Sequence, residues 1–144
     1  FSRATAVKSV AVYIHLPGEP HARLVCIAAQ GEPLENLLAI HEENGTVYLA
    51  CRTAQSGWMN IANDIAYWLS LDEIQGSRNK GSGSQLSIPV ATQNGTVLGV
   101  VHVEFADKDQ ADDAAQTDWS ALALALAEPL KALAGIEDKE EEHE

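Results

Sequence analysis

The stretch SQLSIPVATQNGTVLGVVHVEF, residues 84–105, constrains the fold more than any other part of the sequence. Asn94-Gly95 lies between two runs rich in β-branched and aliphatic residues. An Asn-Gly pair in this setting predicts a two-residue hairpin turn, because both turn positions take a positive φ. With this turn, Gln93 faces Thr96. The register then pairs Val90 with Gly99, Pro89 with Val100, Ile88 with Val101, Ser87 with His102, Leu86 with Val103, Gln85 with Glu104 and Ser84 with Phe105.

The two faces of this hairpin differ in character, because successive side chains of a strand point to opposite sides of a sheet. One face is apolar and should be buried; it holds Leu86, Ile88, Val90, Val101, Val103 and Phe105. The other face holds four polar residues, here called the polar column: Gln85, Ser87, His102 and Glu104. An antiparallel sheet can leave such a face solvated, but Pro89 and Val100 on the same face favour partial cover. The polar column is therefore either a wet surface or the lining of a pocket.

The N-terminal half predicts further strands and a helical insert. Residues 9–16 alternate apolar and more polar side chains, PGEPH supplies a turn, and residues 22–29 return as a second strand. The segment that follows is expected to be a helical insert, because Val47, Ala50, Cys51 and Ala54 have helical spacing and Gly57 can end a helix. WMNIA, residues 58–62, predicts a short third strand, and residues 64–74 a short helix.

The rest of the chain predicts a loop and a terminal helix. GSRNKGSGS, residues 76–84, has the composition of a flexible loop. Residues 118–135 predict the terminal helix, with Asp118 in its first turn, a kink or break at Pro129 and an end at Gly135.

Size and charge limit the function classes. A chain of 144 residues predicts one domain, here 1–136, followed by an acidic disordered tail over 137–144. The formal net charge is −12 and no basic stripe occurs, which excludes nucleic acid and an anionic membrane surface as partners. No apolar run approaches the ~18 residues of a membrane span and no signal peptide is visible, so we expect a cytoplasmic protein. Because the first residue is Phe, we expect an excised or processed chain, with attached signalling domains as further partners.

The cysteines and histidines predict no metal site and no identifiable cofactor. Cys26 and Cys51 are 25 residues apart and lie in apolar runs, where Cys usually packs as a small hydrophobe. We expect both thiols to be buried or unreactive and too far apart to bridge. The five histidines include no HExxH motif and no i, i+4 pair. No nucleophile can be named for His102 to serve as a base, so the sequence predicts no enzyme.

The order of elements, together with three motifs, resembles the GAF domain. ACRTAQSGWMNIAND, residues 50–64, is similar to that family's helix and turn before its third strand. Residues 84–105 are similar to its penultimate hairpin, and TDWSALALALAEPLKALA, residues 117–134, to its last helix. The resemblance spans about residues 9–134.

This resemblance implies an α+β, PAS/profilin-like fold with an antiparallel sheet of five or six strands in the order 2-1-5-4-3. It also implies helices on one face of the sheet and a ligand cavity on the other, which the polar column would line. We expect a cavity of roughly 300 Å³ or more. Trp68 is expected in the core, and Trp58 and Tyr67 either in the cavity wall or in the core under a loop. The implied ligand-binding residues are Tyr13, His15, Trp58, Asn60, Asn63, Tyr67, Gln85, Ser87, His102 and Glu104.

Three functional subtypes of the family are disfavoured by the residues present. The region ADKDQADDAAQTDWSA lacks the pattern of cyclic-nucleotide-binding members, and Cys26 and Cys51 match neither the methionine sulfoxide reductase loops nor a bilin attachment context. The prediction is a non-enzymatic sensory or regulatory module that binds an unidentified small molecule and relays a signal through its terminal helix. The alternatives are a ligand-free dimerisation or partner-binding module and a thiol-dependent methionine sulfoxide reductase that uses Cys51.

The terminal helix also predicts a homodimer. The side chains expected to dock on the sheet are Trp119, Leu122, Leu126, Leu130 and Leu133. A second, uncharged surface of Ala121, Leu124, Ala125 and Ala132 would then be free to pack against another copy. In the alternative, the N-terminal segment ATAVKSV, residues 4–10, covers that surface within one chain.

Overall fold

The computed structural model describes residues 7–41, 44–74, 79 and 82–135. They form one antiparallel sheet of six strands, in the order β3-β2-β1-β6-β5-β4, and five helices. The strands are β1 (Val7–Leu16), β2 (Arg23–Gly31), β3 (Leu37–Ala39), β4 (Asn60–Ala62), β5 (Ser84–Ala91) and β6 (Val97–Phe105). The helices are α1 (Asn44–Val47), α2 (Leu49–Ser56), α3 (Ile65–Ser70), α4 (Asp113–Ala125) and α5 (Ala127–Ala134). The predicted acidic tail lies outside the described residues.

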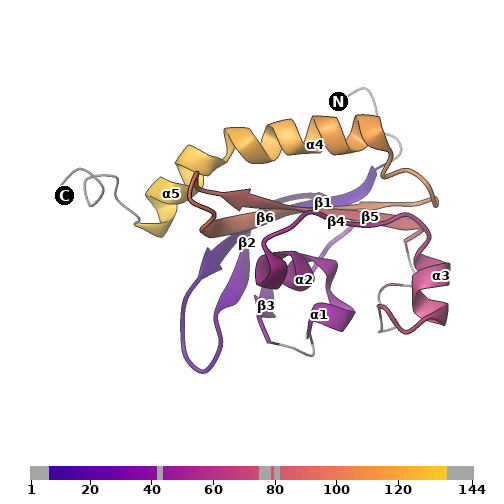
Figure 1. Ribbon diagram of the computed structural model, residues 1–144, viewed down its shortest axis with the longest axis horizontal. Helices are drawn as coiled ribbons and strands as arrows, with labels where there is room; N and C mark the ends of the chain where they lie inside the picture. The colour runs from indigo at the N-terminus through magenta and orange to yellow at the C-terminus, as the bar shows by residue number, and fades with distance from the viewer. Residues whose placement is uncertain (1–6, 42–43, 75–78, 80–81, 136–144) are drawn as a thin grey trace.

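Helices cover both faces of the sheet. Figure 1 shows α4 and α5 along one face and α1, α2 and α3 on the side of the other. The α+β class, the antiparallel sheet and the order of the five predicted strands are confirmed. The expectation of helices on one face only was wrong. The predicted helical insert was also partly wrong, because it contains β3, which pairs with β2 at the edge of the sheet. The helix within it, α2, ends as predicted at Gly57, which has φ 76°.

The hairpin of β5 and β6 has the predicted register along its length, from Val90 opposite Gly99 to Ser84 opposite Phe105. The predicted turn itself was wrong. Within the turn, only Gly95 has a positive φ, of 93°. Thr92 N donates to Thr96 O and Thr96 N donates to Thr92 Oγ1, so residues 93–95 form a three-residue loop. Ala91 then pairs with Val97. A bulge between Val90 and Ala91 shifts the register, so that Val90 and the residues preceding it have the predicted partners. The loop takes one residue from the first strand and the bulge compensates for it.

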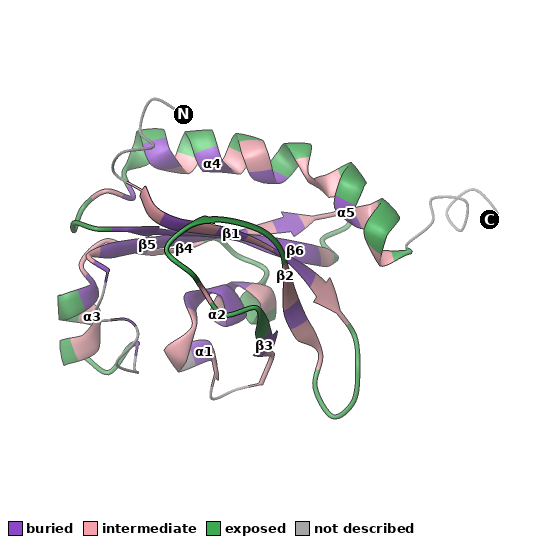
Figure 2. Cartoon of the chain, turned by 180° about the vertical axis from the view of Figure 1, so that it is seen from behind, coloured by how far each residue is buried: buried purple, intermediate pink, exposed green. Residues whose placement is uncertain are grey.

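The main core lies between the apolar face of this hairpin and the terminal helices. The buried cluster joins the six predicted apolar residues of β5 and β6 to Trp119, Ala123 and Leu130, among others. Figure 2 shows the buried sheet with exposed residues on the outer side of α4. Leu133, expected in the docked face, is instead 64% exposed.

The terminal helix begins earlier than predicted and is broken. Asp112, not Asp118, caps α4: its carboxylate accepts a hydrogen bond from Ala115 N at 2.9 Å. The helix stops at Ala125, and α5 begins at Ala127. Pro129 is the third residue of α5, where its missing N–H leaves no gap in the hydrogen bonding of a first turn. The predicted end at Gly135, with φ 77°, is confirmed.

Gly99 allows β1, β6 and α5 to approach one another closely. A Cβ atom at this position would overlap the backbone oxygen of Tyr13 and lie 2.8 Å from Leu130 Cδ1. Because Gly99 has no side chain, α5 can pack directly against the sheet at this position. Among the described residues, no helix combines the length and apolarity that a membrane span requires.

Candidate functional site

The polar column is buried within the protein. The exposed fractions are 0% for Gln85 and Ser87, 4% for His102 and 2% for Glu104. The helix α2 packs against both β5 and β6 and covers this face. The polar column is therefore not a wet surface of the sheet. Its side chains are placed together by the strand period and the hairpin register.

An ion pair candidate lies at the centre of the polar column. His102 Nε2 is 2.9 Å from Glu104 Oε2, and both side chains are almost fully buried. When the imidazole is protonated, the two side chains form a charged pair in a low-dielectric setting. When it is neutral, Nε2 can donate a hydrogen bond to the carboxylate.

Gln85 connects the polar column to the segment before β5. Its Nε2 donates to Asn79 Oδ1 at 3.1 Å and to Ser82 Oγ at 2.9 Å. Asn79 in turn donates from Nδ2 to Val47 O at 2.7 Å. Asn79 and Ser82 are therefore functional candidates that the sequence analysis missed, because their Gly- and Ser-rich surroundings predicted a flexible loop. Both are buried; residues 76–78, 80 and 81 of that predicted loop lie outside the described residues.

Three buried polar atoms of the column have no hydrogen-bond partner among the described residues: Gln85 Oε1, Ser87 Oγ and His102 Nδ1. Native proteins pair nearly all such atoms. Each unpaired buried group costs about 1–3 kcal/mol. The three atoms therefore offer hydrogen bonds to a polar guest: the amide oxygen can accept, whereas the hydroxyl and the imidazole nitrogen can donate or accept.

The free volume beside the polar column is much smaller than expected. The cavity that His102 lines holds about 10 Å³, not 300 Å³ or more; its other lining residues are Tyr13, Glu35, Leu38, Tyr48 and Ala50. This is about the volume that one water molecule occupies. The prediction of volume was wrong because α2, β3 and Tyr13 pack into the space that the resemblance assigned to a ligand.

The predicted aromatic wall is absent from this cavity. Trp58 is 76% exposed and follows the end of α2, and Tyr67 is 58% exposed on α3. Both side chains lie outside the buried polar column. Trp58 therefore lies neither in a cavity wall nor in the core, the two positions predicted for it. Trp68 is half-buried against Leu49 and Ile65, with Arg52 Cζ 5.4 Å from its ring centre.

The two predicted asparagines hold loops in place. Asn60 Nδ2 donates to Thr53 Oγ1 and to Trp58 O, each at 3.0 Å. Asn63 exchanges two hydrogen bonds with the backbone of Ala111, at 3.2 and 3.0 Å. The hydrogen bonds of both amides therefore stabilise the chain around β4.

Tyr13 and His15 lie on the same face of β1, at different depths. The Tyr13 hydroxyl donates to Glu35 O at 2.8 Å and the ring lines the small cavity with His102. His15 Nδ1 lies 3.0 Å from Val97 O, near the hairpin turn, and is half-buried. Of these two residues, the structure brings Tyr13 to the polar column.

No family model matches the sequence, and no curated protein matches it. Solved structures do match. The type II free methionine-R-sulfoxide reductase from Thermoplasma acidophilum aligns over 89% of this chain and 82% of its own, with TM-score 0.71 and 16% identity. The GAF domain of an Acinetobacter phosphoenolpyruvate-protein phosphotransferase aligns over 94% and 77%, with TM-score 0.69 and 16% identity. The GAF domain region of a Geobacter sulfurreducens PCA protein aligns over 91% and 85%, with TM-score 0.70 and 14% identity.

This chain has a GAF-like fold. At these identities the likeness shows the fold alone. The recognition made from residues 50–64, 84–105 and 117–134 is thereby confirmed.

The Cys51 thiol of this GAF-like domain is a poor nucleophile. Cys51 is fully buried, and burial raises the pKa of its thiol to about 12. Its Sγ lies 3.7 Å from Ala39 O. Cys26 is half-buried, with Sγ 3.4 Å from Ala28 O. The packing role predicted for Cys51 is confirmed.

We expect Cys51 to resist alkylation in the native protein. With a pKa of about 12, the thiolate fraction at pH 8 is on the order of 1 in 10⁴. Iodoacetamide labelling at pH 8, followed by peptide mass spectrometry, should show Cys26 labelled first and Cys51 labelled only after denaturation. Rapid stoichiometric labelling of native Cys51 contradicts this expectation.

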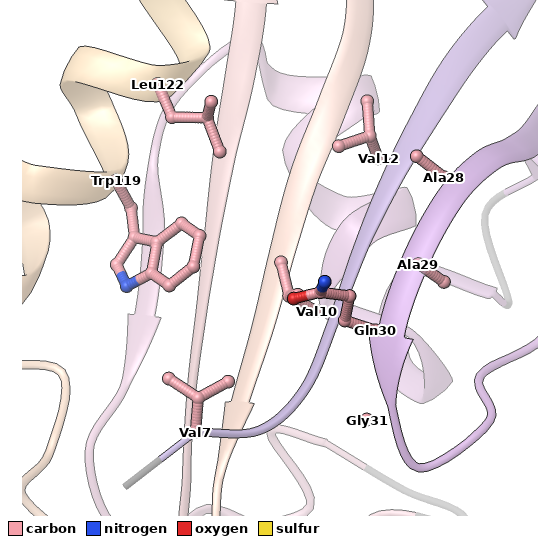
Figure 3. Close-up of a pocket in the computed structure, with 9 residues that line it drawn as sticks. All are labelled: Val7, Val10, Val12, Ala28, Ala29, Gln30, Gly31, Trp119 and Leu122. Atoms are coloured by element: carbon pink, nitrogen blue, oxygen red, sulfur yellow. The ribbon is translucent and has the colours of Figure 1, made fainter. Parts of the chain in front are cut away.

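A larger groove of about 490 Å³ lies on the opposite face of the sheet from the polar column. Figure 3 shows that it runs between the strands β1 and β2 and the helix α4. Its lining residues, none of them charged, are Val7, Val10, Val12, Ala28, Ala29, Gln30, Gly31, Trp119 and Leu122. The sequence analysis placed no cavity there. Within the part of the chain that the structure describes, the groove exists because α4 and α5 pack mainly over β5 and β6 and leave part of β1 and β2 uncovered.

Proposed function

We propose that this GAF-like domain is a non-enzymatic sensory or regulatory module that binds a small polar molecule at the polar column. The observation that carries the proposal is the set of three buried atoms without partners: Gln85 Oε1, Ser87 Oγ and His102 Nδ1. A guest that bonds to them would remove an unfavourable contribution of about 1–3 kcal/mol per atom. The buried Glu104 carboxylate beside them favours a guest that carries a hydrogen-bond donor or a positive charge.

The size of the guest depends on whether the cover moves. A cavity of about 10 Å³ does not hold a ligand of ordinary size. Entry of a larger molecule would displace the contacts of Gln85 with Asn79 and Ser82, which close one side of the column. Exchange of these hydrogen bonds for bonds to the ligand would couple binding to a displacement of Asn79 and Ser82.

Two serines of β5 provide a matched test. Ser84 Oγ donates to Asp107 O at 2.7 Å and accepts from Gln110 N at 3.3 Å, whereas Ser87 Oγ has no partner among the described residues. In ligand-free protein, Ser84→Ala should lower the free energy of unfolding by about 1–3 kcal/mol. Ser87→Ala should leave it unchanged or raise it. Urea denaturation of both variants measures the difference.

Ligand retention completes this test. Native mass spectrometry of the wild type purified from its own host should show a bound small molecule, and Ser87→Ala should retain less of it. Trp58→Ala, a change at an exposed position outside the column, should retain it fully. Wild-type protein without a bound molecule, combined with equal destabilisation by both serine variants, would overturn the proposal.

The likeness to free methionine-R-sulfoxide reductases supports a second candidate, an enzyme that reduces a sulfoxide with Cys51. Such chemistry requires a thiolate. Full burial and a thiol pKa of about 12 disfavour it at Cys51. Turnover of free methionine sulfoxide by the wild type that is lost in Cys51→Ser would favour the enzyme over the sensory module.

We also propose that two copies pair through the outer face of the terminal helices. On this face Leu124 is 79% and Leu133 64% exposed, and Ala121, Ala125 and Ala132 are also exposed. Exposed leucines on both helices favour a second copy of the same chain as partner, although the exposed Glu128 lies between them in the sequence.

Ala125→Glu tests the pairing, because a carboxylate at an exposed small-residue position prevents close packing of two helices. We expect a dimer for the wild type at tens of micromolar and a folded monomer for the variant, measured by sedimentation velocity and circular dichroism. Ala66→Glu makes the same change at an exposed position of α3, on the other side of the sheet from this surface; it serves as the control and should remain dimeric. A monomeric wild type removes the dimer.

A further inference from the structure

We propose that His21 and His41 together form a surface site for a divalent transition-metal ion that prefers imidazole ligands, such as Zn²⁺ or Ni²⁺. The ring centroids of the two histidines are 5.0 Å apart, and the ring planes are tilted by 49°. Twenty positions separate them in the sequence, so no local metal-binding motif predicts that they form a site together. The fold brings them together.

The pairing of β2 with β3 explains why the two side chains meet. Arg23 is opposite Ala39, Leu24 opposite Leu38 and Val25 opposite Leu37. The ladder continues beyond the strands, because Ile40 N donates to Ala22 O at 2.8 Å. The next opposed residues in this register are His21 and His41. Directly opposed residues of antiparallel strands have Cβ atoms about 4.5–5.5 Å apart on the same face, which is the spacing of two chelating side chains.

The distance between the rings fits chelation of one metal ion. Zn²⁺ binds an imidazole nitrogen at about 2.0–2.1 Å and prefers tetrahedral angles. The ring centre lies about 1.1 Å beyond the nitrogen, so two imidazoles on one tetrahedral ion have centres roughly 5 Å apart. The observed distance of 5.0 Å between the ring centres matches this value.

The ring nitrogens of the pair are available for a ligand. His21 is exposed and His41 is half-buried. Among the described residues, neither ring makes a hydrogen bond or an ion pair; the side chain of Gln55 donates instead to the backbone oxygen of His41, at 2.7 Å. This bond holds the His41 backbone without occupying its imidazole. The formal charge of −12 on the chain also favours association with a cation.

Two protein ligands leave the remaining coordination positions to water. Zn²⁺ and Ni²⁺ suit imidazole nitrogen, whereas Mg²⁺ and Ca²⁺ require mainly oxygen ligands and should not bind. A bound ion would connect the turn after β1 to the end of β3 and so fix the edge of the sheet. The inference is independent of the ligand proposed for the polar column.

Paramagnetic Ni²⁺ tests the site directly. In ¹H–¹⁵N spectra of the intact chain, substoichiometric Ni²⁺ should broaden the amide signals near residues 21–23 and 39–41, and Mg²⁺ should not. His21→Gln and His41→Gln should each weaken Ni²⁺ binding by about tenfold or more, because one imidazole alone lacks the effective concentration of its partner. The double variant should lose the localised broadening.

His15→Gln is the matched control, because His15 lies on β1 with its Nδ1 near Val97 O. It should bind Ni²⁺ as the wild type does. Zn²⁺ should raise the midpoint of thermal unfolding in the wild type and in His15→Gln but not in the double variant. Broadening that is absent, that is centred elsewhere in the chain, or that persists in the double variant overturns the proposal.

Discussion

Leu130→Ala is expected to lower the free energy of unfolding by about 2–5 kcal/mol. Leu130 is 1% exposed in the main core, and its Cδ1 lies against the site where Gly99 has no side chain. Removal of the isobutyl group leaves a cavity that β1, β6 and α5 cannot close without a shift of backbone. Urea denaturation followed by circular dichroism measures the loss.

Leu133→Ala is the matched control for this prediction. The chemical change is the same and lies three positions further along α5, but Leu133 is 64% exposed. The variant should differ from the wild type by no more than about 0.5 kcal/mol. Equal losses in the two variants would show that α5 does not dock on the sheet through Leu130. Because Leu133 lies on the surface proposed for dimerisation, the denaturation should be measured at a protein concentration where the chain is monomeric.

His102→Leu is expected to lower the free energy of unfolding by about 3–5 kcal/mol, because it removes a partner from a carboxylate that is almost fully buried. Glu104 is 2% exposed and Oε2 lies 2.9 Å from His102 Nε2. The substituted side chain fills a similar volume, so the loss of the polar contact dominates. The same denaturation experiment applies.

The double variant His102→Leu/Glu104→Leu separates this contact from general damage to the core. With both polar groups replaced, no carboxylate is buried without its imidazole partner, so the double variant should be more stable than His102→Leu alone. The coupling free energy of the cycle should exceed about 0.5 kcal/mol. Additive losses would mean that the two side chains do not interact.

Much of the sheet could be predicted from the sequence, because the strand period of two is strong in residues 9–16 and 84–105. The edge strand β3 could not be predicted from the sequence. Leu34, Leu37, Leu38 and Ile40 fall at spacings that also suit a helix, and a three-residue strand exists only through its pairing with β2. The turn at Gly95 was misassigned for a similar reason: Asn-Gly suits both a two-residue turn and a three-residue loop that ends in Gly.

The polar column was identifiable because a strand period fixes which side chains share a face. Its free volume was not, because volume depends on how closely α2 and β3 pack against Tyr13 and His102. Asn79 and Ser82 escaped notice for a different reason. Polar residues among glycines and serines predict a loop, and their burial arises from the side chain of Gln85, which belongs to another element.

The break between α4 and α5 determines which part of the sheet supports the last helix. The two helices rest on different supports, because α4 packs mainly on β5 and α5 packs on β6 and β1. The backbone changes direction near Leu126, whose N–H still donates to Leu122 O and whose carbonyl accepts from Leu130 N. Gly99 of β6 and Leu130 of α5 meet at the close contact between the sheet and the last helix. Since β6 also carries His102, one strand holds the polar column on one face of the sheet and supports α5 on the other.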